Sequence, residues 1–470
     1  MCIIGVLILG LAGCDKFEDL NKDPNKIYQI KQSSSLLNPI LYRLGSTNLS
    51  NARSIGHTLM QYAVSGQYEN DSELHRYVVL NSTGSGYWGN SYSNLTNIED
   101  MINIAQDNDE SNYLAIALTL RAYTYSMLTD LFGDVPFSEA NKGEEGILQP
   151  KFDSQQEIYT AILADLKTAA GLFDMQKTMN AGGDVLYRGD VLRWQKFCNS
   201  LRIRLLLRVS SKVSTAKAEL VSILNTEPVF SSADDDAILR YTNISPFDNP
   251  YLSERLLNFS DQWGFCTFLV DGFKAISDPR LVAWGTIYKG EGGGYVGIPS
   301  GYPQSVRYPV GEMTSYLTSL QSSDLVSAFV TYSEICFIKA ELALNGDISG
   351  SAQEFYEDGI RASMERWKLN MPTEYLNMPG VKFEGTDEEK MELIMLQKYY
   401  NFFFNDSQAW FEKRRTGLPK LPLGEAVQNG GVMPVRLKYP TSVMSYNEAS
   451  YNKAIEKMGN TDDINYRAWW

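Results

Sequence analysis

The sequence predicts a mainly α-helical protein in which helix pairs pack against an irregular, loop-rich lobe. Long segments carry apolar residues at helical spacing, and several begin with a Ser or Thr that Glu follows three residues later. The helical spacing fades between residues 241 and 302, where aromatic residues are dense and seven glycines fall within 285–301. Long irregular segments inside compact domains are often functional, so we expect the ligand-binding part of the molecule there.

The N-terminal residues predict an exported lipoprotein. Residues 1–13 are apolar but shorter than the ~20 residues that span a bilayer, and they fit a signal peptide. They end in Leu11-Ala12-Gly13-Cys14, which resembles the bacterial lipobox, so we expect cleavage before Cys14 and lipidation of its thiol. A plain signal peptide followed by an incidental cysteine is the alternative. Residues 14–34 are polar and are predicted to be a tether.

The body, 35–470, is predicted to be one domain whose irregular lobe lies mainly at 241–330. Apolar spacing and caps predict helices at 112–132, 151–173, 190–210, 334–344, 352–367 and 386–404. Capping boxes are predicted at Ser154 with Glu157, Ser351 with Glu354, and Thr386 with Glu389. The pair at 333–367 has the length of a tetratricopeptide repeat, although an ordinary helical bundle fits the pattern too.

Composition and charge exclude several kinds of function. The net charge of −14 opposes nucleic acid or anionic lipid as a partner. With only His57 and His75, no three-histidine zinc site or HExxH motif exists. The three cysteines that follow Cys14 are far apart and are expected to be buried free thiols; they are Cys198, Cys266 and Cys336.

Three further motifs have structural explanations. The glycine-rich 290–297 lacks the Lys-Ser/Thr pair of a phosphate-binding loop and is expected to be a flexible loop. Asp234 to Asp236 lack the spacing of a calcium loop, so we expect a solvated turn or cap. Arg414 and Arg415 are expected to form ion pairs at a helix end. The sequence therefore predicts no metal and no cofactor.

Strings along nearly the whole chain resemble the SusD/RagB family, and more closely its branch with an Asn-x-Asp-Pro-Asn segment after the lipid. The strings lie at 14–25, 121–140, 278–281, 297–301, 333–344, 357–367, 397–421 and 434–440. The resemblance implies tetratricopeptide-like helix pairs and a cell-surface lipoprotein of a Bacteroidetes-type outer membrane. It also implies oligosaccharide binding, or peptide binding in some members, no catalysis, and a SusC-like TonB-dependent transporter as partner.

Aromatic rings are the candidate ligand contacts. A pyranose has an apolar C–H face that packs on Trp or Tyr, while polar neighbours select its hydroxyl pattern. The candidates from the irregular stretches are Tyr68, Trp88, Trp263, Trp284, Tyr288 and Tyr295. For each ring, packing in the core is the competing interpretation. The competing function is a helical-repeat adaptor that binds only protein.

Overall fold

The computed structural model describes residues 30–67, 73–290, 292–322 and 324–470. Cys14, the predicted signal peptide, most of the predicted tether and Tyr68 lie outside the described residues. The helices are α2 (Ser34–Asn51), α3 (Ser85–Asp107), α4 (Ser111–Phe132), α5 (Gln155–Leu172), α6 (Val191–Val209), α7 (Ala216–Thr226), α8 (Thr267–Ala275), α9 (Arg280–Trp284), α10 (Tyr332–Leu344), α11 (Ala352–Arg366), α12 (Asp387–Asn401), α13 (Gln408–Thr416), α14 (Thr441–Tyr446) and α15 (Glu448–Glu456). The strands are β1 (Ala63–Ser65), β2 (Ala237–Leu239), β3 (Trp263–Phe265) and β4 (Ser327–Val330).

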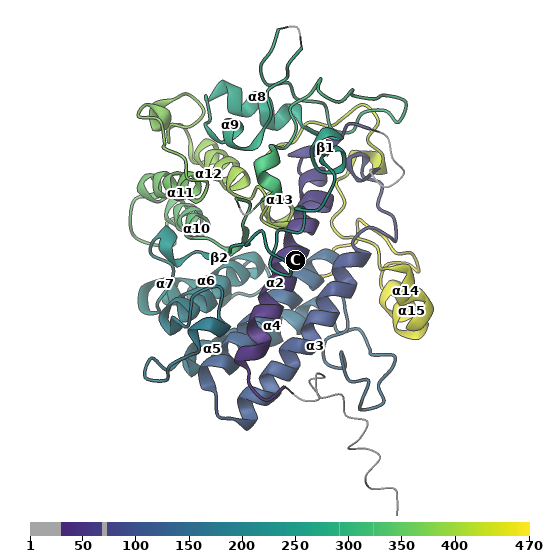
Figure 1. Ribbon diagram of the computed structural model, residues 1–470, viewed down its shortest axis with the longest axis vertical. Helices are drawn as coiled ribbons and strands as arrows, with labels where there is room; N and C mark the ends of the chain where they lie inside the picture. Colours follow the sequence, from purple (N-terminus) through teal and green to yellow (C-terminus); the bar gives the residue numbers. More distant parts are fainter. Residues whose placement is uncertain (1–29, 68–72, 291, 323) are drawn as a thin grey trace, which may run out of the picture.

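Helices that are consecutive in the chain pack side by side. The series α3 to α7 forms one array, and α10, α11 and α12 form another. In Figure 1 the first array fills the lower part of the molecule, and the second lies at the left above it. Helix α2 runs through the middle toward the upper end, where α8, α9 and β1 lie. The mainly helical fold of paired helices is therefore confirmed.

The predicted caps explain where several helices begin. Ser154 and Glu157 form the full capping box of α5, and Thr386 with Glu389 forms that of α12. Ser351 accepts a hydrogen bond from the backbone N–H of Glu354 at the start of α11. Because these bonds use only neighbouring residues, the predicted helix starts agree closely with the structure.

Buried arginines of α6 join the two helical arrays. Arg204 Nε donates to Glu334 Oε1 of α10 at 2.6 Å, and both side chains are almost fully buried. Arg208 Nη1 donates to Asp130 Oδ2 of α4 at 2.7 Å. A buried charge is tolerated only when it is paired and hydrogen-bonded, so these contacts fix α6 between its neighbours.

The upper end of the molecule, which we call the upper lobe, contains the short elements α8, α9, β1 and β3 and a hydrogen-bond network around Arg280. Strand β1 pairs antiparallel with β3, and β2 with β4. Arg280 is fully buried and donates to Asp278 Oδ2 at 2.6 Å and to Gln397 Oε1 of α12 at 2.8 Å. The Asp-Pro-Arg-Leu string at 278–281 thus anchors the lobe to the second array. Helices α8 and α9 were not predicted, because each is too short to show a clear helical period.

The remaining motifs are structural. The thiols Cys198, Cys266 and Cys336 are buried and free, as predicted. Arg415 pairs with Glu341 at 2.6 Å, which confirms the expected ion pairing at the end of α13. Asp234 is exposed, as a turn residue should be, but Asp235 and Asp236 are buried, so the expectation of a solvated turn was wrong for them.

Their burial has a clear cause. Asp235 pairs with Lys196 at 2.8 Å, and Asp236 accepts the backbone N–H of Tyr332 at 2.5 Å. Among the residues described, no cluster of His, Cys, Asp or Glu could hold a metal ion. Within the same residues, no helix is both long and apolar enough to cross a bilayer.

Candidate functional site

Trp284 lies in the core. Its side chain is 0% exposed, and its ring stacks on Phe403 with centroids 4.0 Å apart and meets the edge of Trp367 at 5.2 Å. Protein side chains therefore surround the Trp284 ring, and no ligand reaches it in this conformation. The loop contact predicted for Trp284 is replaced by packing between α9 and the end of α12.

Trp88 lies in the first turn of α3 and not in a loop. Gly84, with φ of +79°, ends the preceding loop and lets the helix begin at Ser85. The half-buried ring of Trp88 packs edge-on against Phe132, with centroids 5.0 Å apart. It lines a surface cleft of about 270 Å³ together with Tyr92, and exposed Tyr446 of α14 closes the other side.

The other predicted rings lie in the upper lobe. Trp263 is in β3, half-buried, with the guanidinium of Arg53 5.6 Å from its ring centroid. Tyr288 and Tyr295 are half-exposed near the bridge between Tyr288 and Gly294. Across the described part of the chain, no ring contact joins any two of the predicted aromatics.

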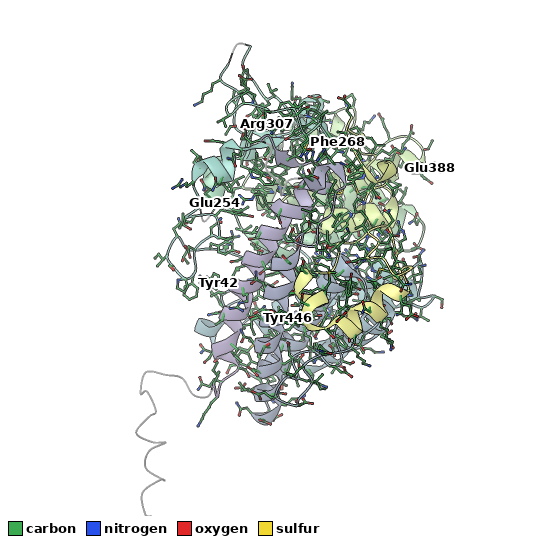
Figure 2. All side chains as sticks on the ribbon, turned by 90° about the vertical axis from the view of Figure 1, so that its right-hand side faces the viewer. Tyr42, Glu254, Phe268, Arg307, Glu388 and Tyr446 are labelled. Atoms are coloured by element: carbon green, nitrogen blue, oxygen red, sulfur yellow. The ribbon has the colours of Figure 1, made fainter. Side chains whose placement is uncertain are left out.

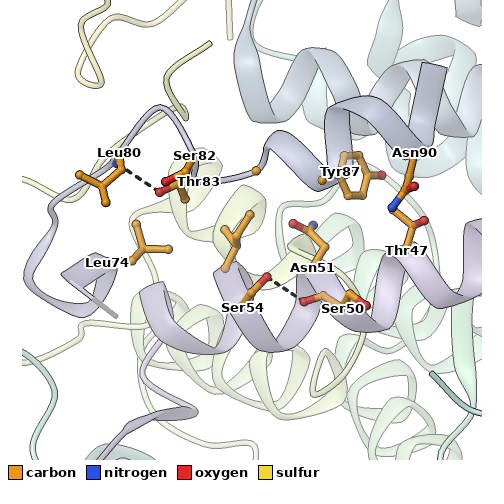
Figure 3. A pocket seen from close by; sticks show the side chains of 13 residues that line it. Thr47, Ser50, Asn51, Ser54, Leu74, Leu80, Ser82, Thr83, Tyr87 and Asn90 are labelled. Atoms are coloured by element: carbon orange, nitrogen blue, oxygen red, sulfur yellow. Dashed lines mark hydrogen bonds between the residues drawn. The ribbon is translucent and has the colours of Figure 1, made fainter. Parts of the chain in front are cut away.

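A different set of residues forms a pocket between α2 and the start of α3 (Figure 3). Its volume is about 350 Å³. Hydroxyl and amide side chains from both walls line it, together with a few apolar side chains at one end. The lining consists of Thr47, Ser50, Asn51, Ser54, Ile55, Leu74, Leu80, Ser82, Thr83, Gly84, Gly86, Tyr87 and Asn90.

Local bonds hold the polar groups in place. The backbone N–H of Leu80 donates to Thr83 Oγ1 at 3.1 Å, and Ser54 Oγ donates to the carbonyl of Ser50 at 2.8 Å. Burial holds the pKa of the Tyr87 phenol well above its usual range, so it stays neutral. Each hydroxyl that is fixed in this way keeps lone pairs for a ligand.

Asn51 carries the clearest sign of a missing partner. Its side chain is 3% exposed, and its Nδ2 donates to Asp406 and, at 2.9 Å, to Ser407. Its Oδ1 finds no hydrogen-bond partner among the described residues. A buried acceptor without a donor is costly. This oxygen is closed off from the pocket as well, so a ligand hydroxyl could reach it only after a local rearrangement.

The pocket continues along α2. A second hollow of about 310 Å³ shares Thr47, Ser50 and Asn90 with it and extends to Tyr42. The half-exposed Tyr42 side chain gives the hollow an aromatic wall, and its ring centroid lies 4.6 Å from that of Phe247, which is not part of the lining. We call the two hollows together the α2 groove. Tyr42 lies at the left edge of Figure 2, whereas Tyr446 of the Trp88 cleft lies near its centre.

The chemistry of the groove favours binding over catalysis. No carboxylate, histidine, lysine or cysteine lines the pocket of Figure 3 among the residues that the structure covers. Serine and threonine hydroxyls act as nucleophiles when an adjacent base activates them, and these lining residues include no carboxylate, histidine or lysine as that base. The hydroxyls and amides instead match a ligand rich in hydroxyl groups.

Sequence reasoning overlooked the groove. Ser46, Ser50 and Ser54 recur every four residues, which places them on one face of a helix that is otherwise largely apolar. This row of serine hydroxyls could have been recognised from the sequence. Residues 80–84, which form the opposite wall, come close to these serines only in the folded protein. The cavity itself therefore could not be predicted from the sequence.

Comparisons with known proteins agree with the fold and with the kind of ligand. A family model for SusD-like proteins, described as starch-binding and associating with the outer membrane, matches residues 24–440. A chitin-binding protein superposes with a TM-score of 0.81 at 26% identity, over 93% of this chain and 99% of that chain. No curated protein matches the sequence.

Two SusD homologues of known structure are also similar. The one from Bacteroides fragilis has a TM-score of 0.81 at 25% identity, over 94% of this chain and 99% of its own. A chitin-binding SusD homologue from Flavobacterium johnsoniae has a TM-score of 0.80 at 21% identity, over 93% and 98%, and supports the fold alone. With its family match extending over most of its length, this chain belongs to the SusD-like family of glycan-binding proteins associated with the bacterial outer membrane.

Proposed function

We propose that this protein is a cell-surface lipoprotein without enzymatic activity that captures an oligosaccharide in the α2 groove and delivers it to a partner TonB-dependent transporter. The observation that carries the proposal is the groove itself, which hydroxyl and amide side chains line from both walls. Sugar hydroxyls donate and accept hydrogen bonds, so they complement such a lining. Tyr42 would supply the aromatic contact with a sugar ring.

Two glycines of α3 give a matched test. A Cβ at either Gly86 or Gly89 would meet no atom within 4 Å, so both positions accept a side chain without a clash. Gly86 lines the pocket and Gly89 does not. Gly86→Leu should therefore fill the groove, while Gly89→Leu makes the same chemical change outside it.

The measurement is isothermal titration calorimetry of the purified protein with oligosaccharides from starch and from chitin. We expect at least one to bind, Gly86→Leu to weaken it at least tenfold, and Gly89→Leu to leave it unchanged. If wild type, Gly86→Leu and Gly89→Leu all bind with equal affinity, the groove is not the binding site. If Trp88→Ala then abolished binding, the cleft at Trp88 and Tyr446 would be the site, as the sequence predicted for Trp88.

The other predicted rings remain proposed contacts with the ends of a longer ligand, except for Trp284, which is buried. Trp263, Tyr288 and Tyr295 are each partly exposed in the upper lobe. Binding of peptides but of no oligosaccharide would favour a peptide-binding member of the family. Binding of neither, with stable capture of another protein, would favour the adaptor alternative.

A further inference from the structure

A third cavity opens next to Tyr42 and lengthens the groove. It has a volume of about 530 Å³ and shares the Tyr42 side chain with the second hollow. Its walls come from 181–193 and from 233–242, on either side of the start of α6. The charged residues in its lining are Asp184, Arg188, Arg193, Asp234, Asp236 and Arg240.

Two of its arginines are available to a ligand. Arg188 and Arg240 are exposed, and in the described ranges neither makes an ion pair or a side-chain hydrogen bond. Arg193 is held in place, because its guanidinium lies 4.4 Å from the Tyr187 ring centroid and donates to the carbonyl of Asp234. Arg43 lines the adjoining hollow and donates only to the Ser93 hydroxyl.

The carboxylates of the cavity offset only part of this positive charge. Asp184 is buried and its oxygens accept four hydrogen bonds, from the backbone N–H groups of Leu186, Tyr187 and Gly189 and from Trp194 Nε1. Burial raises the pKa of Asp236 to about 7, so this carboxyl is only partly ionised at neutral pH.

Asp234 is the one exposed carboxylate in the lining. Arg43, Arg188, Arg193 and Arg240 outnumber the carboxyls of Asp184, Asp234 and the partly ionised Asp236. A small local excess of positive charge therefore remains, although the whole protein carries −14. Such a cluster is unusual in an acidic protein and marks a place where an anion would be stabilised.

We propose that the extended groove binds an anionic oligosaccharide, with its neutral sugars along α2 and a carboxylate or sulfate group held by Arg188 and Arg240. The proposal rests on the proposed function and specifies its ligand class. From Tyr42 to Asn51, both of which line the groove, α2 rises about 14 Å at 1.5 Å per residue, so the ligand is a chain of several sugars. Guanidinium groups bind carboxylate and sulfate through paired, charge-assisted hydrogen bonds.

Paired ligands isolate the contribution of the charge. Hexagalacturonate and its methyl ester have the same sugars, and esterification removes each negative charge while it adds only a methyl group. A sulfated galactan oligosaccharide and its desulfated form make the corresponding pair for sulfate. Comparison of the two pairs also decides which anion the arginines prefer.

The variants are Arg188→Gln/Arg240→Gln and the control Arg255→Gln, which changes an exposed arginine that lines neither the groove nor the cavity. Because neither Arg188 nor Arg240 holds a structural contact, the double variant should fold normally, which its melting temperature checks. By calorimetry at low salt, we expect at least one anionic form to bind about tenfold or more tightly than its neutral partner. The double variant should abolish that preference without weakening the neutral form, and Arg255→Gln should retain it.

Each failure has a distinct meaning. If neutral and anionic forms bind equally, or if the double variant keeps the preference, the anionic ligand is wrong and the proposed glycan binding stands. If no glycan of either pair binds, and starch and chitin oligosaccharides also fail, the proposed function and this inference are both overturned. Gly86→Leu should weaken both members of a pair, since their sugars would share the groove.

Discussion

Single arginines differ sharply in what they do in this molecule. Arg204, Arg208 and Arg280 are buried, and each faces a carboxylate within 2.7 Å. Removing one member of such a pair leaves an uncompensated buried charge, which typically costs about 3–5 kcal/mol. Arg188 and Arg240 are exposed beside a cavity and form no ion pair in the described part of the chain, although carboxylates also line that cavity. The first group maintains the fold, while the second is free to meet a ligand.

Trp284 gives a prediction at the same scale. Trp284→Ala should lower the free energy of unfolding by about 3–5 kcal/mol, because it removes a large side chain from a packed core. Denaturant unfolding measures this change. Tyr446→Ala, which removes a ring that is 79% exposed, is the control and should leave stability nearly unchanged. Unchanged stability together with lost glycan affinity would instead restore Trp284 as a ligand contact.

Helices were predictable where their determinants are local. The capping boxes of α5 and α12 use residues three positions apart, and the apolar spacing of α4 and α6 is visible in the sequence. Trp88 was misplaced because the Gly-Ser-Gly string at 84–86 is typical of a loop, yet Gly84 ends the loop and α3 begins directly after it. The environment of Trp284 depends on Phe403, more than a hundred residues away, which no local pattern reveals.

The junction between α2 and the α12–α13 connection yields a pH prediction. Asp406 lies in that connection, fully packed and hydrogen-bonded to Asn51 at the end of α2. Burial raises its pKa to about 7, against ~3.9 for an unfolded chain. Between these values the folded state keeps a proton that the unfolded chain has lost. This carboxyl should therefore make stability fall as pH rises from about 4 to 7, by at most ~1.4 kcal/mol per pH unit.

Asp406→Asn removes the titrating group while keeping a similar shape. The difference in unfolding free energy between variant and wild type should grow in favour of the variant from pH 4 to pH 7 and then level off. Chemical denaturation at a series of pH values measures it. Asp107→Asn, at an exposed position of α3, should show no such trend. A difference that stayed constant across the window would contradict the elevated pKa.

The whole molecule has to be held at a membrane to act as proposed. Cys14 is the predicted lipidation site, and an extended segment of the length of 14–34 reaches at most about 70 Å. Several acyl chains give stable anchoring where a single one is marginal. Cys14→Ala should therefore shift the protein from the outer-membrane fraction to the soluble fraction. Cys2→Ala, on the other side of the predicted cleavage point, should stay membrane-bound. If Cys14→Ala sediments with the outer membrane as completely as Cys2→Ala does, Cys14 is not the anchor.

A TonB-dependent transporter is the remaining proposed partner, and the lipid anchor affects how tightly the protein would bind it. A lipid anchor and a protein contact act as two linked interactions, so the anchor raises the effective concentration of the protein at the transporter. The net charge of −14 disfavours non-specific adhesion to anionic lipid, so recovery of a complex would report a specific contact. Tagged protein captured from native membranes in mild detergent should bring with it a TonB-dependent transporter, in wild type and in Gly89→Leu alike. Capture of the protein alone, with that transporter present in the membranes, would leave a free-standing glycan receptor and refute delivery.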